Sequence, residues 1–214
     1  MAIDTPARLA ILGAGPIGLE AALYARFLGY DVVVYERGEV AEAVRQSGHL
    51  RLLAPFGKNH STLGLAAIEA QDENYQPPAD DALLTGNEWR EKYLLPLSQT
   101  DLIADHLRLH TTVTVVSTED GSEWSVLSRD ANGQERVELF EGVLDCTGAQ
   151  ASLAEGPQIQ FEQPEQSFCT LGSKAAAGSN FLFQDGLTQI RSTFAILGDR
   201  ATLDLYAGAE QLLR

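Results

Sequence analysis

Three glycines and one acid near the start of the chain have the types and spacing of a dinucleotide site. Gly13, Gly15 and Gly18 form a G-x-G-x-x-G pattern, and Glu36 follows Gly18 after 17 intervening residues. The first glycine of such a pattern allows a tight turn, the second lets the backbone approach a pyrophosphate, and the third lets a helix pack closely on a strand. A carboxylate about 20 residues further on can accept hydrogen bonds from ribose hydroxyls. The spacing therefore predicts a bound pyrophosphate at the glycines and a ribose at Glu36.

The residues around the glycines supply the elements that would position this site. The apolar run at 8–12 predicts a buried strand, 16–28 a helix, and 31–36 a second strand. Pro16 suits a first helical turn, and Pro16 and Ile17 would stand beside the ligand. The start of a helix carries unpaired N–H groups and about half a positive charge, so it favours a phosphate.

Downstream, the hydrophobic period changes to that of strands. Short β-rich runs fill residues 111–145, and Asp120-Gly121 and Asn132-Gly133 separate them with tight-turn dipeptides. The pattern predicts an antiparallel β-meander that leads into one more buried strand, ending at Thr147 and Gly148.

Helix signals occur before and after the meander. Thr85 with Glu88 forms a capping box, and Pro96 should end or kink the helix that follows. A second helical segment is expected from Gln99 to Leu109. Residues 38–80 contain a possible strand at 49–56 and otherwise give no firm prediction. The chain then closes with a strand at 168–172 and an amphipathic helix that stops at Gly198.

The three glycines of the motif, with Ala22, Gly29 and Glu36, match a longer pattern. This pattern resembles the fingerprint of the FAD-binding domain in pyridine nucleotide-dependent flavoprotein oxidoreductases, the group of thioredoxin-reductase-like enzymes and flavin monooxygenases. A strand that ends in a threonine-glycine pair, here Thr147 and Gly148, also follows the order of that group. The resemblance implies an α/β fold, a Rossmann-like FAD/NAD(P)-binding domain with a central parallel sheet and an antiparallel meander. It implies FAD as cofactor and two-electron redox chemistry on the flavin. The matching positions are Gly13, Gly15, Gly18, Ala22, Gly29 and Glu36.

The group closes its flavin domain with a strand that ends in glycine, often followed by aspartate, and then a helix. Gly198 and Asp199 copy those letters, but they end an amphipathic pattern. Gly172 and Ser173 have the expected order of strand, glycine, loop and helix, so the resemblance favours them as flavin-contacting residues. Serine in place of the acid removes the usual contact to the ribityl chain.

The resemblance covers one domain of a larger relative. Residues 1–214 are expected to form a single FAD-binding domain, with 1–148 as its N-terminal part and 165–198 as its closing strand and helix. Only 19 residues separate Gly148 from Phe168, and the chain holds no second G-x-G-x-x-G. A second, NAD(P)H-binding domain is therefore expected to be absent.

Three functions fit these patterns. The first is an FAD-dependent oxidoreductase, the second an NAD- or NADP-dependent dehydrogenase, and the third a non-catalytic or partner-dependent FAD-binding protein. Electrons would come from NAD(P)H or from a reductase partner. No side chain stands out as an acid, base or nucleophile, and the sequence names no substrate.

The remaining candidates for chemistry are weak. Cys146 and Cys169 are expected to be structural, and His106 with His110 lacks a third metal ligand. Arg37 could lie along the adenosine. The formal net charge of −15 argues against nucleic-acid or membrane partners, and two cysteines without a leader pattern favour the cytoplasm.

Overall fold

The protein is described by a computed structural model that covers residues 3–119, 121–148, 158–160, 167–176 and 181–207. A central sheet of five parallel strands has the order β3-β2-β1-β7-β9. The expected strand-helix-strand unit stands at its middle, because β1 and β2 are neighbours joined through α1. The strands are β1 (Arg8–Leu12), β2 (Asp31–Tyr35), β3 (Leu107–Arg108), β7 (Gly142–Asp145) and β9 (Phe168–Thr170).

A second sheet holds the predicted meander. Its strands are ordered β6-β5-β4-β8, and β4, β5 and β6 are antiparallel neighbours. Asn132-Gly133 forms the predicted tight turn between β5 and β6, while Asp120 of the other turn lies outside the described residues. The parallel partner β8 was not predicted. These strands are β4 (Thr112–Ser117), β5 (Trp124–Arg129), β6 (Glu135–Phe140) and β8 (Gln158–Gln160).

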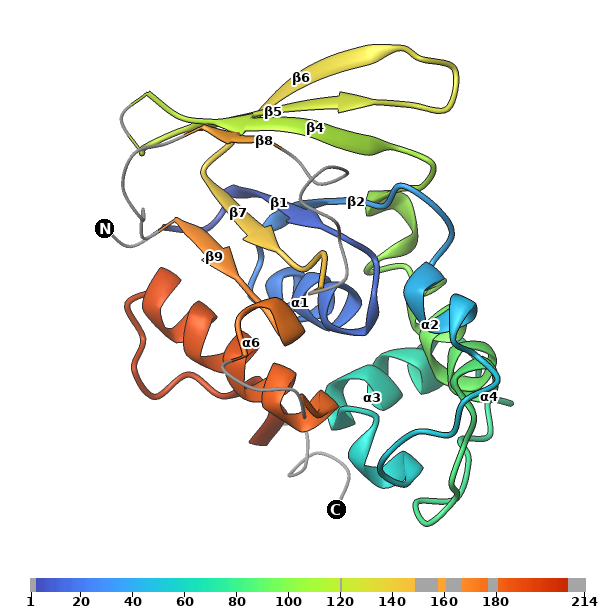
Figure 1. Cartoon of the computed structure of the whole chain (residues 1–214). Coiled ribbons are helices and arrows are strands. Elements are labelled where there is room, and N and C mark those ends of the chain that lie inside the picture. Colours follow the sequence, from blue (N-terminus) through green and yellow to red (C-terminus); the bar gives the residue numbers. More distant parts are fainter. Residues whose placement is uncertain (1–2, 120, 149–157, 161–166, 177–180, 208–214) are drawn as a thin grey trace.

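Alternation along the central strands divides the interior into two cores. In β1, Leu9 and Ile11 pack with the helices, whereas Ala10 and Leu12 pack with the meander. Figure 1 shows the result as three layers, with the second sheet on one side of the central sheet and the helices on the other. The predicted α/β fold with a parallel sheet and a meander is confirmed.

The helical layer is built around α1 and α6, which contact each other beneath the central sheet (Figure 1). Gly29, with a φ of 90°, follows the end of α1, and Gly198 caps α6, both as expected. The helices are α1 (Pro16–Phe27), α2 (Glu42–Gln46), α3 (Thr62–Gln71), α4 (Gly86–Trp89), α5 (Leu95–Ser98) and α6 (Phe183–Leu197). Within the described residues, no helix is both long enough and apolar enough to cross a membrane.

The predicted capping box is present at the start of α4. The Glu88 backbone N–H donates to the Thr85 hydroxyl, and the Thr85 backbone N–H donates to the Glu88 carboxylate. A π-helical segment over Arg90–Leu94 then joins α4 to α5, and Pro96 lies in the first turn of α5. The proline therefore coincides with an irregular helix that ends two residues later.

One prediction of secondary structure was wrong, and an open one is now settled. The helix expected over 99–109 is a turn followed by a 3-10 turn at Ala104–His106 and then β3. Leu107 pairs with Val34 at the edge of the central sheet, and this tertiary pairing overrides the local helical pattern. The possible strand at 49–56 makes only one isolated bridge, from Arg51 to Thr85. In the unassigned stretch 38–80, the structure places α2 and α3.

Candidate dinucleotide-binding cleft

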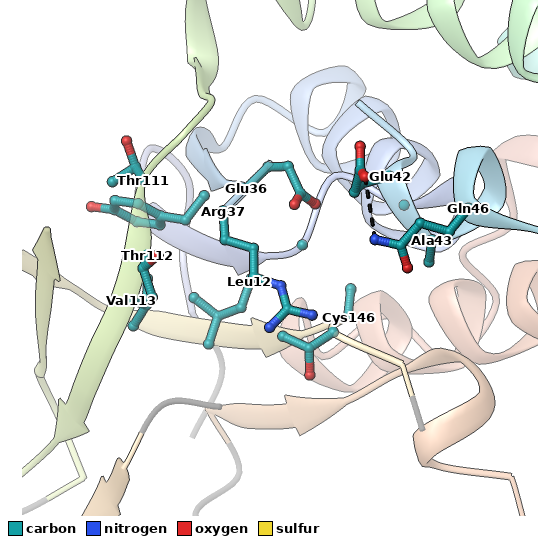
Figure 2. A pocket seen from close by; sticks show the side chains of 14 residues that line it. Leu12, Glu36, Arg37, Glu42, Ala43, Gln46, Thr111, Thr112, Val113 and Cys146 are labelled. Atoms are coloured by element: carbon teal, nitrogen blue, oxygen red, sulfur yellow. Dashed lines mark hydrogen bonds between the residues drawn. The ribbon is translucent and has the colours of Figure 1, made fainter. Parts of the chain in front are cut away.

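An open cleft lies at the carboxyl ends of the central strands, which is where parallel α/β sheets bind ligands. It encloses about 800 Å³ of space between protein atoms, the open solvent at its mouth included. The start of α1, the helix α2 and the start of β4 surround it (Figure 2). The lining residues are Leu12, Gly13, Gly15, Tyr35, Glu36, Arg37, Glu42, Ala43, Gln46, Thr111, Thr112, Val113, Cys146 and Thr147.

The three glycines of the motif have different local constraints. Gly13 has a φ of +100°, and a Cβ there would lie 2.9 Å from the Cys146 carbonyl oxygen. A Cβ on Gly18 would collide with the Gly13 carbonyl oxygen, so this glycine lets α1 pack against the loop. A Cβ on Gly15 would meet no atom of the described residues within 4 Å. The fold thus requires Gly13 and Gly18, whereas Gly15 keeps open a space that belongs to the cleft.

The start of α1 presents its positive end to this space. Gly15 is the N-cap residue, it makes no side-chain cap, and no acidic residue lies in the first turn. Pro16 stands in the first turn as predicted, and it has no N–H of its own to satisfy. The first N–H groups of a helix lack partners within the helix. Here they are available to an anion.

Glu36 links the glycine loop to the end of β2. Its carboxylate accepts the Ala14 backbone N–H at 2.9 Å through Oε2 and the Gly38 backbone N–H at 2.9 Å through Oε1. A carboxylate has about four acceptor positions, so two remain for hydroxyl donors. The neighbouring Arg37 extends its side chain into the cleft (Figure 2).

The far wall of the cleft comes from segments that the sequence did not connect with it. Glu42, Ala43 and Gln46 line it from α2, where the Gln46 amide donates to the Glu42 carboxylate at 3.2 Å (Figure 2). Residues 111–113 line it from the start of β4. A five-residue helix is too short to show a hydrophobic period, so no sequence signal pointed to α2.

The remaining predicted site residues lie close to one another after the ends of β7 and β9. A Cβ on Gly148 would lie 3.8 Å from the Ser173 hydroxyl, and a Cβ on Gly172 would lie 3.7 Å from the Ile17 side chain. Gly172 has a φ of +78° and directly follows β9 and Leu171, whereas the competing Gly198 only caps α6. The structure therefore brings residues from four separate segments to one edge of the sheet.

Known proteins resemble this chain in sequence and in fold. No protein-family model matches the chain. A flavin-containing monooxygenase of Arabidopsis thaliana, FMO GS-OX3, is 26% identical over 177 residues, which is 73% of this chain and 38% of that protein. A probable N-methylproline demethylase of Rhizobium meliloti (strain 1021) is 26% identical over 167 residues, 75% of this chain and 23% of that protein.

Solved structures show the same layers. The S-allyl-L-cysteine S-oxygenase of Allium sativum superposes with a TM-score of 0.53 at 20% identity, over 67% of this chain and 37% of that one. The bacillithiol disulfide reductase Bdr of Bacillus cereus superposes with a TM-score of 0.51 at 15% identity, over 70% and 45%. The chain shares its fold with these enzymes. This confirms the resemblance predicted from the sequence, and the chain spans less than half the length of each of these relatives.

Within this fold, the surroundings of Cys146, Cys169, His106 and His110 fit structural roles. Cys146 and Cys169 are both thiols, and burial raises the pKa of each, that of Cys169 to about 11. Neither is therefore a thiolate at neutral pH. His106 Nδ1 donates to the Val32 carbonyl oxygen at 3.0 Å, and His110 has a φ of 51°. The pair does not share a helix face, and the described residues contain no cluster suited to a metal.

A charged group that the sequence did not indicate lies beside the threonine-glycine pair. Asp145, at the end of β7, is fully buried. It accepts the Thr147 hydroxyl at 2.7 Å and the Lys174 ammonium at 2.6 Å. The two charged residues are 29 positions apart, and the pairing of β9 with β7 is what brings them together.

Proposed function

We propose that this chain is the FAD-binding part of an oxidoreductase. The observation that carries the proposal is the cradle at Gly15, where the start of α1, without a side-chain cap, faces a space that no atom of the described residues enters within 4 Å of a Cβ at Gly15. The relatives named above include a flavin-containing monooxygenase, which supports FAD over NAD or NADP as the ligand. When bound, FAD would supply two-electron redox chemistry.

Different residues along the edge of the central sheet would bind different parts of the cofactor. The N–H groups at Ile17 and Gly18 would hold the pyrophosphate, and the free acceptor positions of Glu36 would hold the adenosine ribose. Arg37 and residues 111–113 would flank the adenine. The flavin half would extend the other way, past Thr147 and Gly148 toward Gly172 and Ser173.

The same proposal covers domain organisation. Residues 1–148 and 165–198 would form one FAD-binding domain, because the 19 residues between Gly148 and Phe168 are too few for another domain. The electron donor would be NAD(P)H or a reductase partner that docks on the flavoprotein.

Titration of the purified protein tests the cofactor directly. We expect FAD to bind with quenching of its fluorescence, and to be released on denaturation, whereas NADH and NADPH should bind more weakly to the same cleft. Tighter binding of NADH than of FAD would favour the dehydrogenase instead. Reduction of bound FAD by NADPH, followed as loss of flavin absorbance, then shows whether a separate electron donor is required.

A substitution at Glu36 tests the position of the ribose. Glu36→Ala removes the acceptor for the ribose hydroxyls and should weaken FAD binding by about tenfold or more. Glu39→Ala is the matched control, because Glu39 is also an acid after β2 but pairs with His110 outside the cleft. Equal loss of affinity in both variants would contradict the assignment of Glu36.

A further inference from the structure

The Asp145–Lys174 pair differs from a surface ion pair in the burial of its carboxylate and in the additional hydrogen bonds that this carboxylate accepts. Asp145 accepts the Thr147 backbone N–H at 3.1 Å and the Thr147 hydroxyl at 2.7 Å through one oxygen, and Lys174 through the other. The Asp145 side chain is 1% exposed, whereas the Lys174 side chain is 33% exposed. A buried carboxylate costs desolvation free energy, and an apolar residue often serves the stability of a fold better. The pair therefore calls for a role other than stability.

The backbone that carries Lys174 is fixed from another side. The Gly172 backbone N–H donates to the Gln189 side-chain oxygen at 2.7 Å, and the Gln189 amide nitrogen lies 3.5 Å from the Gly172 carbonyl oxygen. Gln189 belongs to α6, so the 3-10 turn Gly172–Lys174 is tied to the helical layer as well as to β7. The position of the ammonium is thereby set before any ligand binds.

The ammonium lies at the edge of the cleft. Lys174 Nζ is 3.5 Å from Thr147 Oγ1, and Thr147 lines the cleft. Thr147 in turn touches the phosphate loop, since its Cα lies 3.4 Å from the position of a Cβ on Gly13. Lys174 thus stands beside Thr147, which separates it from the glycine loop on the β7 side, and Glu36 and Arg37 stand on the β2 side.

Few positive charges lie near the cleft, and this favours a role for Lys174 in binding an anion. The chain has a net charge of −15, and Glu36 and Glu42 line the cleft. Arg37 is the one cation among the described lining residues, and it stands at the adenosine end. A pyrophosphate brings further negative charge. An ammonium has three donors, so Lys174 can bind Asp145 and still donate to a ligand.

We propose that Lys174 is a cofactor-binding residue whose ammonium, oriented by Asp145, donates to a phosphate oxygen of the dinucleotide on the flavin side of the pyrophosphate. This inference rests on the proposed FAD binding. It also accounts for Ser173: where flavoproteins of this group often have an acid, this chain has a serine followed by a cation.

Affinity for FAD, measured by fluorescence quenching at two salt concentrations, tests the proposal. Lys174→Gln should weaken binding about tenfold or more at low salt, because a charge-assisted hydrogen bond is lost. Its affinity should also depend less on salt than that of the parent. Lys174→Arg keeps the charge and should retain more affinity than Lys174→Gln. Lys92→Gln, an exposed lysine on the π-helical segment, is the matched control and should bind FAD like the parent.

A double variant separates ligand binding from a structural role. Lys174→Gln alone leaves a buried Asp145 without its cation, which could disturb the fold. Asp145→Asn with Lys174→Gln removes both charges and should fold, as thermal unfolding of the FAD-free protein would verify, yet it should still bind FAD weakly. Parent-like affinity in the double variant, or in Lys174→Gln itself, overturns the proposal and leaves the FAD assignment intact. A parent protein that binds no FAD overturns both.

Discussion

The Glu20 carboxyl is fully buried on α1, away from the cleft, and burial raises its pKa to about 7. The Tyr93 and Ser61 hydroxyls both donate to its Oε1, and hydrogen bonding to Tyr93, Ser61 and Tyr206 offsets only part of the increase in pKa that burial causes. The tyrosine and the serine belong to the π-helical segment and to the N-cap of α3. Glu20 therefore joins three helices.

The shift in the pKa of Glu20 predicts a loss of stability with rising pH. The folded state holds the Glu20 proton more tightly than the unfolded state, so its contribution is complete below about pH 4.5 and is lost as the pH rises to about 7. Glu20→Gln is neutral at every pH. Its free energy of unfolding should exceed that of the parent by about 3 kcal/mol at pH 8 and should be similar to it near pH 4.

Urea unfolding at the two pH values measures this difference. Glu88→Gln is a useful control because Glu88 is an exposed acid in the α4 capping box, and hydrogen bonds from Thr85 lower its pKa. Its effect on stability should have the opposite dependence on pH. A difference between Glu20→Gln and the parent that stays constant from pH 4 to 8 would show that Glu20 has an ordinary pKa.

At the scale of single residues, spacing along the chain revealed the glycines and Glu36, because their tasks are local to one strand-turn-helix unit. It did not reveal Lys174 or Glu20. Lys174 acquires its place from Asp145, 29 positions away, and Glu20 from Tyr93, 73 positions away. Such pairs leave no periodic trace in a single sequence.

At the scale of elements, the junction between β1 and α1 makes a sharp prediction about two neighbouring glycines. Gly18→Ala should lower the free energy of unfolding by about 1–3 kcal/mol or more, because its Cβ would collide with the Gly13 carbonyl oxygen. Gly15→Val should leave the FAD-free protein nearly as stable as the parent, since the part of the chain that the structure describes has no atom within 4 Å of a Cβ there.

The same pair should behave differently toward FAD. The valine side chain at residue 15 would occupy the space that the pyrophosphate needs, so FAD binding should be lost from a folded protein. Thermal unfolding without ligand and FAD titration together provide the measurement, and Gly15→Ala should be intermediate in affinity. A Gly15→Val protein that retains FAD would exclude the cradle at Gly15 as the phosphate site.

Two elements show when a local sequence signal is enough to predict structure and when it is not. The capping box of Thr85 and Glu88 needs only four consecutive residues, and it is present. Residues 99–109 carried a helical pattern, yet Leu107 and Arg108 pair with β2. Pairing with β2 gives the backbone N–H and C=O groups of these two residues hydrogen-bond partners within the sheet, whereas a short isolated helix is only marginally stable in water. The strand therefore forms in place of the helix.

At the scale of the whole molecule, the second sheet stabilises the central one through a separate core. Trp124 is fully buried in that core, and its indole N–H donates to the Ser167 hydroxyl at 2.9 Å. Trp124→Ala should therefore lower the free energy of unfolding by about 3–5 kcal/mol. It should also weaken FAD binding, because Val113 belongs to the same core and lines the cleft.

Trp89→Ala is the comparison, because Trp89 is buried in the helical core on the other side of the sheet. We expect a similar loss of stability from this variant, measured by urea unfolding, and a smaller effect on FAD affinity at temperatures where both proteins are folded. If the two variants lost FAD affinity equally, the meander would have no specific part in shaping the cleft.

The order of residues along the chain dictates the strand-helix-strand unit, the meander and the closing helix, because hydrophobic period, glycine turns and helix caps act within a few residues. The three-dimensional arrangement alone places α2 and the start of β4 around the cleft, pairs Lys174 with Asp145, and buries Glu20 between helices. These features depend on which strands become neighbours. That choice is made by packing across the whole molecule, between residues that are far apart in sequence.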